Sequence, residues 1–235
     1  MKKTFLFFSF LFFLAILGCD LEDKADKNLE KNKNTLKVGD NEYEVVKKSD
    51  GNYRTKDNIS HIPEGNTSND TWCYNDNKDE CDKYGRLYSY NAAKEACKYI
   101  GDGWELPSDN DWQQLEMKMG CDEEELGMDV MGEVGCDISE NEETNWRCED
   151  LSWDNENDVG LNGKVLELPG YRMPMGETHF LGKIGYWWSS TTQKNPQTGE
   201  DFVWTRSLEK DNNSFIRNLK SKEYGLSVRC IRKTD

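Results

Sequence analysis

Eight cysteines are the feature of this 235-residue sequence that most restricts how it folds. They occur in a polar chain, of which 32% is charged and 35% is hydrophobic. So many cysteines in a polar protein are typical of oxidising compartments, where they pair as disulfides. We therefore expect an exported protein stapled by disulfides. The length fits one globular domain with appendages better than two full domains.

The N-terminus has the pattern of an export signal. Two lysines precede an apolar run over residues 5–17, which is shorter than the roughly 20 residues of a membrane-spanning helix. The run leads into Gly18 and Cys19, and this junction resembles a bacterial lipobox, in which the signal is cut before a cysteine that carries the lipid. We expect a lipoprotein signal peptide over residues 1–18, a lipid on Cys19 and contact with the membrane through that lipid. The alternative is a soluble secreted protein.

A charged segment follows the cysteine. Nine of the fifteen residues from 20 to 34 are charged, with both signs mixed, so residues 19–34 are expected to form a disordered tether. Fully extended, such a tether reaches on the order of 50 Å. These features predict an outer-membrane lipoprotein that faces the exterior, with its domain over residues 35–235. Once Cys19 carries a lipid, seven cysteines remain, which allows at most three disulfides and one spare thiol.

The charge balance argues against polyanionic partners. The net charge is −15 at pH 7, and a chain so acidic is repelled by nucleic acid and by anionic lipid headgroups. Seventeen acidic residues and two basic ones lie between residues 111 and 158. A solvated, loop-rich insertion explains this charge. A site for a cation or a basic partner is the alternative.

Residue periodicity predicts two helices. Over residues 91–100, small and apolar side chains including Cys97 fall on one stripe, and a glycine follows. A second helix is expected after Pro107, with Ser108 as its N-cap, Asp111 in the capping-box position and Gly120 as its terminator.

Alternating patterns predict strands on either side of these helices. Residues 43–59 are typical of a hairpin, and residues 59–71 of a loop. The sequence therefore predicts an α+β fold with two helices packed on an antiparallel sheet. Four segments of the C-terminal third are predicted to form a meander, namely 185–192, 201–208, 214–220 and 226–233.

The sequence offers little that is typical of an enzyme. Its two histidines, His61 and His179, have no motif partner, and it contains neither a nucleophile elbow nor a phosphate loop. We expect a protein without catalytic residues and without a cofactor. Asp154, Glu156 and Asp158 alternate like the start of an EF-hand loop, but the glycine and the closing glutamate are out of place. At most, these three residues predict a structural calcium ion.

Aromatic side chains are the candidate ligand contacts. Their ring faces can stack on a sugar while their polar atoms form hydrogen bonds; packing in the core is the alternative. Trp187 and Trp188 are adjacent in a predicted strand and point to opposite faces, so we expect at most one of them in the core. The candidate residues are Trp146, Trp153, Tyr171, Trp187, Trp188 and Trp204.

Seven short motifs follow one another along the chain, beginning at Trp72-Cys73, Cys81-Asp82, Ala92-Ala93, Gly103-Trp104, Leu168-Pro169, Gly185-Tyr186 and Ser227-Val228. Their order resembles that of one protein family, the Fibrobacter succinogenes major paralogous domain family. The resemblance spans roughly residues 35–232 and implies a fold related to C-type lectins and formylglycine-generating enzymes, with long irregular loops, in surface lipoproteins. The stretch 121–148 is more acidic and richer in cysteine than the family pattern.

The cysteine spacing suggests two pairs of the lectin-like kind. Cys73 with Cys81 would form a local clip, and Cys97 with Cys230 a long closure. In the chain-entropy model the long closure contributes about 4–5 kcal/mol and the short one roughly 3 kcal/mol or less. The other three cysteines of the domain cannot all pair, so one is free, reactive or bound to another chain. They are Cys121, Cys136 and Cys148.

Together these features predict a surface binding module. Loops between residues 146 and 192, carried on a scaffold stiffened by disulfides, would recognise a glycan or a surface protein. The alternative is a structural protein of the cell envelope whose acidic face acts in assembly.

Overall fold

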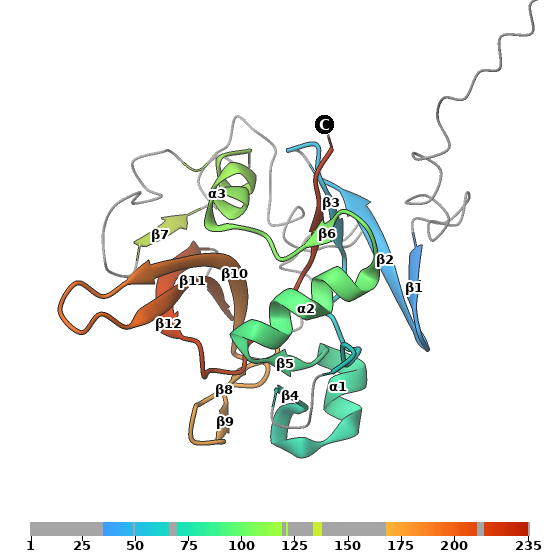
Figure 1. Cartoon of the computed structure of the whole chain (residues 1–235), viewed down its shortest axis with the longest axis horizontal. Coiled ribbons are helices and arrows are strands. Elements are labelled where there is room, and N and C mark those ends of the chain that lie inside the picture. The colour runs from blue at the N-terminus through green and yellow to red at the C-terminus, as the bar shows by residue number, and fades with distance from the viewer. Residues whose placement is uncertain are drawn as a thin grey trace, which may run out of the picture.

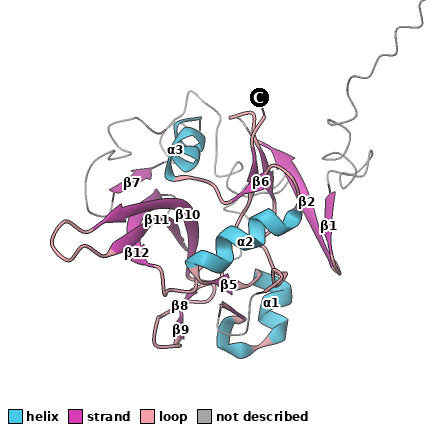
Figure 2. Cartoon of the chain, in the orientation of Figure 1, coloured by secondary structure: helices cyan, strands magenta, loops and turns pink. Residues whose placement is uncertain are grey.

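The computed structural model describes residues 35–48, 50–65, 70–118, 121, 134–137, 168–210 and 214–234. Within these residues the chain is a mixed α+β protein with three α-helices, antiparallel sheets and two fully described disulfides (Figure 1, Figure 2). The predicted α+β class with antiparallel sheets is therefore confirmed. None of the helices described is long and apolar enough to cross a membrane.

The first sheet joins the start of the domain to its last strand. Its order is β1-β2-β3-β13-β6, so β13 lies between two strands from earlier in the chain. The prediction that residues 226–233 extend the C-terminal meander is wrong, because Ile231 pairs with Arg54 on one side and with Glu105 on the other. The strands are β1 (Thr35–Val38), β2 (Asn41–Lys47), β3 (Tyr53–Thr55), β6 (Trp104–Glu105) and β13 (Ile231–Arg232).

The second sheet contains the other three predicted strands of the meander. Its order is β10-β11-β12-β7, and all pairs are antiparallel. The register of β10 shifts between Trp188 and Thr192. At this bulge the hydroxyl of Thr191 accepts a hydrogen bond from the backbone of Asp109 at 2.9 Å. The strands are β7 (Val134–Asp137), β10 (Ile184–Lys194), β11 (Asp201–Glu209) and β12 (Ser214–Ser221).

Two short strand pairs lie at one end of the molecule, at the bottom of Figure 1. The pair β4-β5 comes before the central helix, and the pair β8-β9 comes before β10. An isolated bridge between Gly170 and Gly185 attaches the β8-β9 hairpin to the second sheet. Another, between Arg172 and Gly225, attaches it to the segment that follows the last residue of that sheet, Ser221. The strands are β4 (Thr71–Trp72), β5 (Leu87–Tyr88), β8 (Tyr171–Arg172) and β9 (Thr178–His179).

Both predicted helices are present. Helix α2 (Tyr90–Ile100) runs between the two sheets and contacts β1, β6 and β10 (Figure 1). Helix α3 (Asp109–Lys118) begins with the predicted capping box: the backbone of Asp111 donates to the hydroxyl of Ser108 at 3.1 Å, and the Ser108 backbone donates to the Asp111 carboxylate at 2.8 Å. This reciprocal pair satisfies two donors that a helix start otherwise leaves unpaired.

A third helix was not predicted. Helix α1 (Lys78–Tyr84) buries only Cys81 and so lacks an apolar stripe that would reveal it in the sequence. It follows a 3-10 turn (η2, Tyr74–Asp76), and the side chain of Asn77 caps it by accepting from the backbone of Asp79 at 3.1 Å. A disulfide between Cys73 and Cys81 holds it to the preceding loop.

The core has two parts, one on each face of the second sheet. Trp188 packs on the α2 side among Tyr90, Val203 and others, whereas Trp187 packs on the α3 side with Trp112 and others. Trp187 and Trp188 are 2% and 0% exposed. The expectation that at most one of them lies in the core is wrong, because elements distant in sequence cover both faces of the sheet.

Both suggested disulfides are present. Cys97 on α2 is bonded to Cys230, which lies 133 residues later and directly before β13, and Cys73 is bonded to Cys81. Cys121 is disulfide-bonded as well. It is therefore not the spare thiol among the three remaining cysteines of the domain.

Candidate functional site

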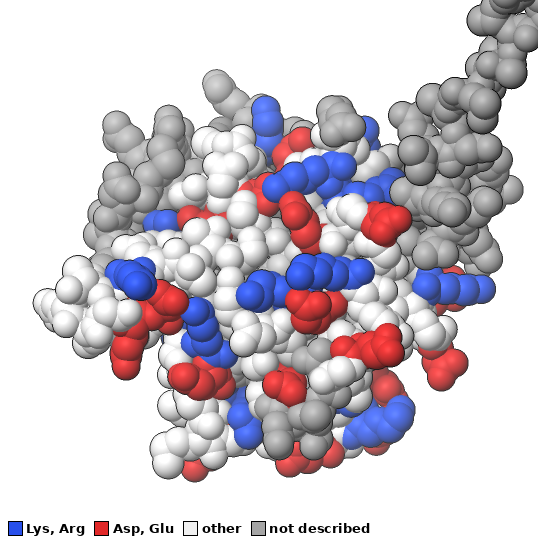
Figure 3. Space-filling view, viewed as in Figure 1, with Lys and Arg blue, Asp and Glu red and all other residues white. Residues whose placement is uncertain are grey.

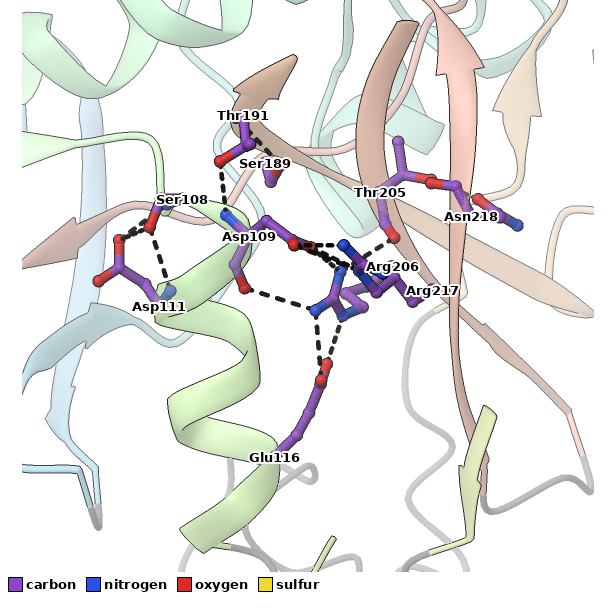
Figure 4. A network of polar contacts seen from close by, with 10 residues as sticks. All are labelled: Ser108, Asp109, Asp111, Glu116, Ser189, Thr191, Thr205, Arg206, Arg217 and Asn218. Atoms are coloured by element: carbon purple, nitrogen blue, oxygen red, sulfur yellow. Dashed lines mark hydrogen bonds and ion pairs between the residues drawn. The ribbon is translucent and has the colours of Figure 1, made fainter. Parts of the chain in front are cut away.

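A buried polar network attaches α3 to the second sheet (Figure 4). Arg206 on β11 donates to Asp109 at 2.7 Å and also to Glu116, both on α3. Arg217 on β12 donates to the second oxygen of Asp109 at 2.8 Å. All four side chains are at least nine-tenths buried. Such a network holds the scaffold together but offers no group to a ligand in solvent.

The charges in this network stabilise one another. Burial alone would raise the pKa of Asp109, but its hydrogen bond to Arg217 and the positive charge of Arg206 outweigh burial and hold that pKa below its ordinary value. Burial alone would lower the pKa of Arg206, whereas the charge of Glu116 raises it. Both groups are therefore ionised at neutral pH, and the sheet is fixed rigidly against α3.

The other face of this sheet ends in a cluster of partly exposed rings, which we call the aromatic surface: Tyr171, His179, Phe180, Tyr186 and Tyr224. Tyr171 lies at its centre. The Tyr171 ring is 5.9 Å from the ring of Phe180 in a stacked arrangement, 5.2 Å from Tyr186 edge to face, 5.9 Å from His179 and 6.2 Å from Tyr224, measured between centroids. Segments far apart in the sequence thus bring their rings together around one tyrosine.

Local backbone geometry positions the rings. Gly170, directly before β8, has φ +67°, and a Cβ there would overlap the carbonyl oxygen of His179 and lie 2.8 Å from the Tyr74 ring. Only glycine permits this close approach of the two strands. The hairpin is also held to η2, because the hydroxyl of Thr178 donates to the side chain of Asn75.

Phe180 is held in a conformation that its residue type disfavours. Its φ is +63°, in the left-handed region, and its side chain is 47% exposed. Bulky residues rarely adopt this conformation, which costs roughly 1–2 kcal/mol for a residue other than glycine. The hairpin therefore keeps an aromatic ring in solvent at a position where the backbone favours glycine.

Cationic side chains border the aromatic surface. The ammonium of Lys220 lies 4.7 Å from the centroid of Tyr186 and 5.6 Å from that of Tyr224. Nearby, the guanidinium of Arg172 lies 4.1 Å from the ring of Trp72. On the face shown in Figure 3, blue and red residues alternate over the part of the chain that the structure describes. With Lys220 beside its rings, the aromatic surface combines apolar ring faces with polar atoms at their edges.

The central tyrosine of this surface, Tyr171, is neutral at physiological pH. Burial, and then the neighbouring Tyr224, raise the pKa of Tyr171 above its ordinary value. Its hydroxyl can therefore both donate and accept a hydrogen bond at physiological pH. Rings of this kind offer a ligand a large, rigid contact area at low cost in conformational entropy.

The predicted ligand residues divide into three groups. Tyr171 lies at the centre of the aromatic surface. Trp187, Trp188 and Trp204 are buried. The guanidinium of Arg217 lies 3.5 Å from the centroid of the Trp204 ring. Because both faces of the sheet are covered, these three rings are closed to a ligand. Six predicted residues lie outside the described part of the chain: Cys19, Trp146, Trp153, Asp154, Glu156 and Asp158.

Four members of the aromatic surface were not predicted as ligand contacts. Tyr186 points to the opposite face of β10 from Trp187, and this alternation could have marked it as a candidate ligand contact. The sequence carries no comparable signal for His179, Phe180 or Tyr224, which only the hairpin and the turn after β12 bring next to Tyr171.

Potential metal ligands are dispersed over the part of the chain that the structure describes. Within them, no three His, Cys, Asp or Glu side chains gather closely enough to hold a metal ion. His61 is buried, and burial lowers its pKa to about 4. His179 belongs to the aromatic surface, with Nε2 3.5 Å from the carboxylate of Glu177.

Comparison with known proteins identifies the family. The model of the Fibrobacter succinogenes major domain matches residues 28–232, which is nearly the whole chain. No curated protein and no solved structure matches the chain.

Proposed function

Since the chain belongs to the Fibrobacter succinogenes major domain family, we propose that it is a lipid-anchored binding module of the bacterial cell surface, which recognises a glycan or a protein through the aromatic surface. In this proposal the lipid on Cys19 holds the module at the outer membrane, and the charged residues 20–34 act as a tether. The domain then stands clear of the bilayer and can meet ligands from outside the cell.

The observation that carries the proposal is the state of Phe180. A phenylalanine at φ +63° with almost half of its side chain in solvent contributes less to stability than glycine or asparagine would at that backbone conformation. Strained residues of this kind concentrate where function requires them. Its stacking on Tyr171 gives the ring a fixed orientation, as expected for a residue kept for contact with a ligand.

The rest of the molecule supports this role through its rigidity. The buried network around Asp109 fixes one face of the second sheet, and the disulfide between Cys97 and Cys230 closes the chain around α2. A rigid scaffold that presents preorganised rings loses less entropy when it binds.

We also propose that the fold is of the C-type lectin kind. Two observations support this assignment: a long disulfide joins the central helix to the residue before the last strand, and the two longest helices pack on antiparallel sheets. In this chain the ligand would then be bound by the aromatic surface rather than by a calcium ion.

A binding survey tests the proposed function. The full-length chain in detergent would be applied to an immobilised glycan array and to a panel of purified extracellular proteins. The Phe180→Ala variant should lose most of the signal, because it removes the exposed ring. The matched control is Tyr99→Ala, which removes a ring of nearly equal exposure, 48% against 47%, from α2.

The survey has two clear outcomes. A ligand that wild type and Tyr99→Ala retain but Phe180→Ala loses supports the proposal. The absence of any ligand, or ligands that bind all three proteins equally, contradicts it.

A further inference from the structure

Two hydrogen bonds join η2 to the β8-β9 hairpin, and they fall on either side of Phe180. The hydroxyl of Thr178 donates to the side chain of Asn75, and the backbone of Leu181 donates to the hydroxyl of Tyr74 at 3.4 Å. Thr178 and Leu181 flank Phe180 in the chain. Tyr74 and Asn75 therefore hold the segment that presents the exposed ring.

Residues in the left-handed conformation gather at this contact. Among the described residues, only three other than glycine have a positive φ: Asn75 at +52°, Asp76 at +55° and Phe180 at +63°. Side chains disfavour this conformation, although asparagine and aspartate tolerate it better than phenylalanine does. It persists where the surrounding structure imposes it, and it is concentrated at ligand sites and switch regions. The turn η2 therefore needs a restraint.

The disulfide between Cys73 and Cys81 supplies this restraint. Cys73 directly precedes η2 and Cys81 lies in α1, so the bond closes a short loop that contains the whole of η2. A short closed loop has far fewer conformations than an open one. Opening the bond would let Asn75 and Asp76 relax, and the two hydrogen bonds that flank Phe180 would then be lost.

The short disulfide is more accessible to thiols than the long one. Cys73 is partly exposed, whereas both cysteines of the long disulfide, Cys97 and Cys230, are 0% exposed. The guanidinium of Arg86 also donates to Sγ of Cys73 at 3.6 Å. Such a cation attracts an incoming thiolate and stabilises a departing one. We therefore expect the short disulfide to exchange with thiols while the long one stays closed.

We propose that the Cys73–Cys81 disulfide is a redox site, which a dithiol reduces and whose reduction releases η2 and the position of Phe180. One thiolate of the dithiol attacks Sγ of Cys73 and displaces Cys81, which takes up a proton. The second thiolate attacks the dithiol's own sulfur in the mixed disulfide and displaces Cys73 beside Arg86. The two cysteines gain two electrons and two protons, which the dithiol loses as it becomes a disulfide.

The effect of reduction is confined to one end of the molecule. The long disulfide joins α2 to the residue before β13, and the buried network around Asp109 joins α3 to the second sheet, so other elements form both. The oxidised protein presents Phe180 and the reduced protein does not. Only the resulting loss of ligand binding rests on the proposed function; the release of η2 does not.

Differential alkylation tests which disulfide reacts first. The full-length chain in detergent would be treated with dithiothreitol without denaturant, then with iodoacetamide, and its peptides would be mapped by mass spectrometry. Cys73 and Cys81 should be labelled at least about tenfold faster than Cys97 and Cys230, because a thiolate must reach the sulfur that it attacks.

A charge variant tests the role of Arg86. Arg86→Gln should slow the reduction of the short disulfide about threefold, because it removes the cation beside Cys73. The matched control is Lys98→Gln, which removes an exposed positive charge from α2 and should leave the rate unchanged. Equal rates in wild type and Arg86→Gln would contradict the part assigned to this arginine.

A spectroscopic measurement tests the release of Phe180. In protein labelled with ¹⁵N-phenylalanine, the amide signal of Phe180 should shift when the short disulfide is reduced, and that of Phe215 in β12 should not. The double variant Cys73→Ala/Cys81→Ala should show the shifted Phe180 signal without any reductant. If this variant does not fold, the signals of the reduced wild-type protein decide the question.

The outcomes separate this inference from the proposed function. Labelling of Cys97 and Cys230 as early as Cys73, a Phe180 signal that reduction leaves unmoved, or loss of the whole fold on reduction overturns the redox site. A Phe180 signal that moves although the binding survey finds no ligand supports the redox site and contradicts the proposed function. A ligand that binds the oxidised and reduced proteins equally overturns redox control and leaves the proposed function intact.

Discussion

Arg206 on β11 lies against Glu116 on α3, ninety residues away in the sequence, and its Nη2 donates to the glutamate carboxylate at 3.2 Å. Both side chains are almost completely buried. Removal of one partner would leave a charge without compensation in the interior, which typically costs about 3–5 kcal/mol.

Glu116→Ala is therefore expected to lower the free energy of unfolding by about 3 kcal/mol or more, measured by urea denaturation. Glu95→Ala serves as the control, because it breaks an exposed pair with Lys98 and should cost less than about 1 kcal/mol. Equal losses in the two variants would contradict the role assigned to the buried network.

Stability should also depend on pH through His61. Its Nε2 donates to the carbonyl of Ala96 at 2.9 Å, so Nδ1, 3.0 Å from the hydroxyl of Tyr43, is the acceptor in the neutral ring. Burial lowers the pKa of His61 to about 4, whereas an exposed histidine in the unfolded chain has a pKa near 6.5.

Between these two pKa values the unfolded chain binds more protons than the folded one, so stability falls as the pH falls from about 6.5 to 4. The contribution of His61 amounts to about 3 kcal/mol over this range. His61→Gln keeps a donor for Ala96 but does not titrate, so its unfolding free energy should decline less between pH 7 and pH 4. Parallel declines in wild type and variant would show that other groups govern the acid response.

The two disulfides should contribute unequally. The bond between Cys97 and Cys230 spans 133 residues, against 8 for the bond between Cys73 and Cys81. In the chain-entropy model, replacing the first pair by alanine costs about 5 kcal/mol and the second about 3 kcal/mol or less. Urea denaturation of the two double variants measures the difference, and a larger loss for the short loop would refute the ranking.

Gly170→Ala should disrupt the aromatic surface. The substitution introduces a Cβ into a position occupied by the His179 carbonyl and forces alanine to φ +67°. We expect a loss of at least about 2 kcal/mol and a reduced near-UV circular dichroism signal from the tyrosines.

The matched control is Gly182→Ala, where φ is +69° but nothing lies within 4 Å of the added Cβ. It incurs only the backbone cost of roughly 1 kcal/mol. If both alanine variants keep the tyrosine signal, close approach at Gly170 does not position the rings.

The lipid anchor can be checked directly. Cys19→Ser should move the protein from the membrane fraction to the soluble fraction, and mass spectrometry of the wild-type N-terminal peptide should find a lipid on Cys19. An unmodified N-terminus that still carries residues 1–18 would contradict both the anchor and the cleavage.

Local features of the fold could be read from the sequence because they depend on neighbours within a few residues. The capping box of Ser108 and Asp111 and the apolar stripe of α2 are of this kind. Helix α1 lacks such a signal, since a side-chain cap and a disulfide hold it rather than an apolar face. The place of β13 could not be foreseen either, because two pairing residues on each side leave little pattern in the sequence.

The candidate site was predicted in part. Tyr171, one of the aromatic residues named from the sequence, lies at the centre of the aromatic surface. Alternation within β10 correctly placed Trp187 and Trp188 on opposite faces, but it carries no information on what covers each face. The exposure of Phe180 depends on the turn after β9, and its stacking on Tyr171 depends on how the hairpin closes.

The position of β13 has a consequence for the order of folding. Because residues 231–232 form the strand that joins β3 to β6 in the first sheet and Cys230 closes the bond to α2, a nascent polypeptide that has not yet released this segment lacks both that pairing and the covalent closure. Native assembly of that sheet must wait until synthesis or passage across a membrane has delivered the last strand, so the chain is expected to stay export-competent until then.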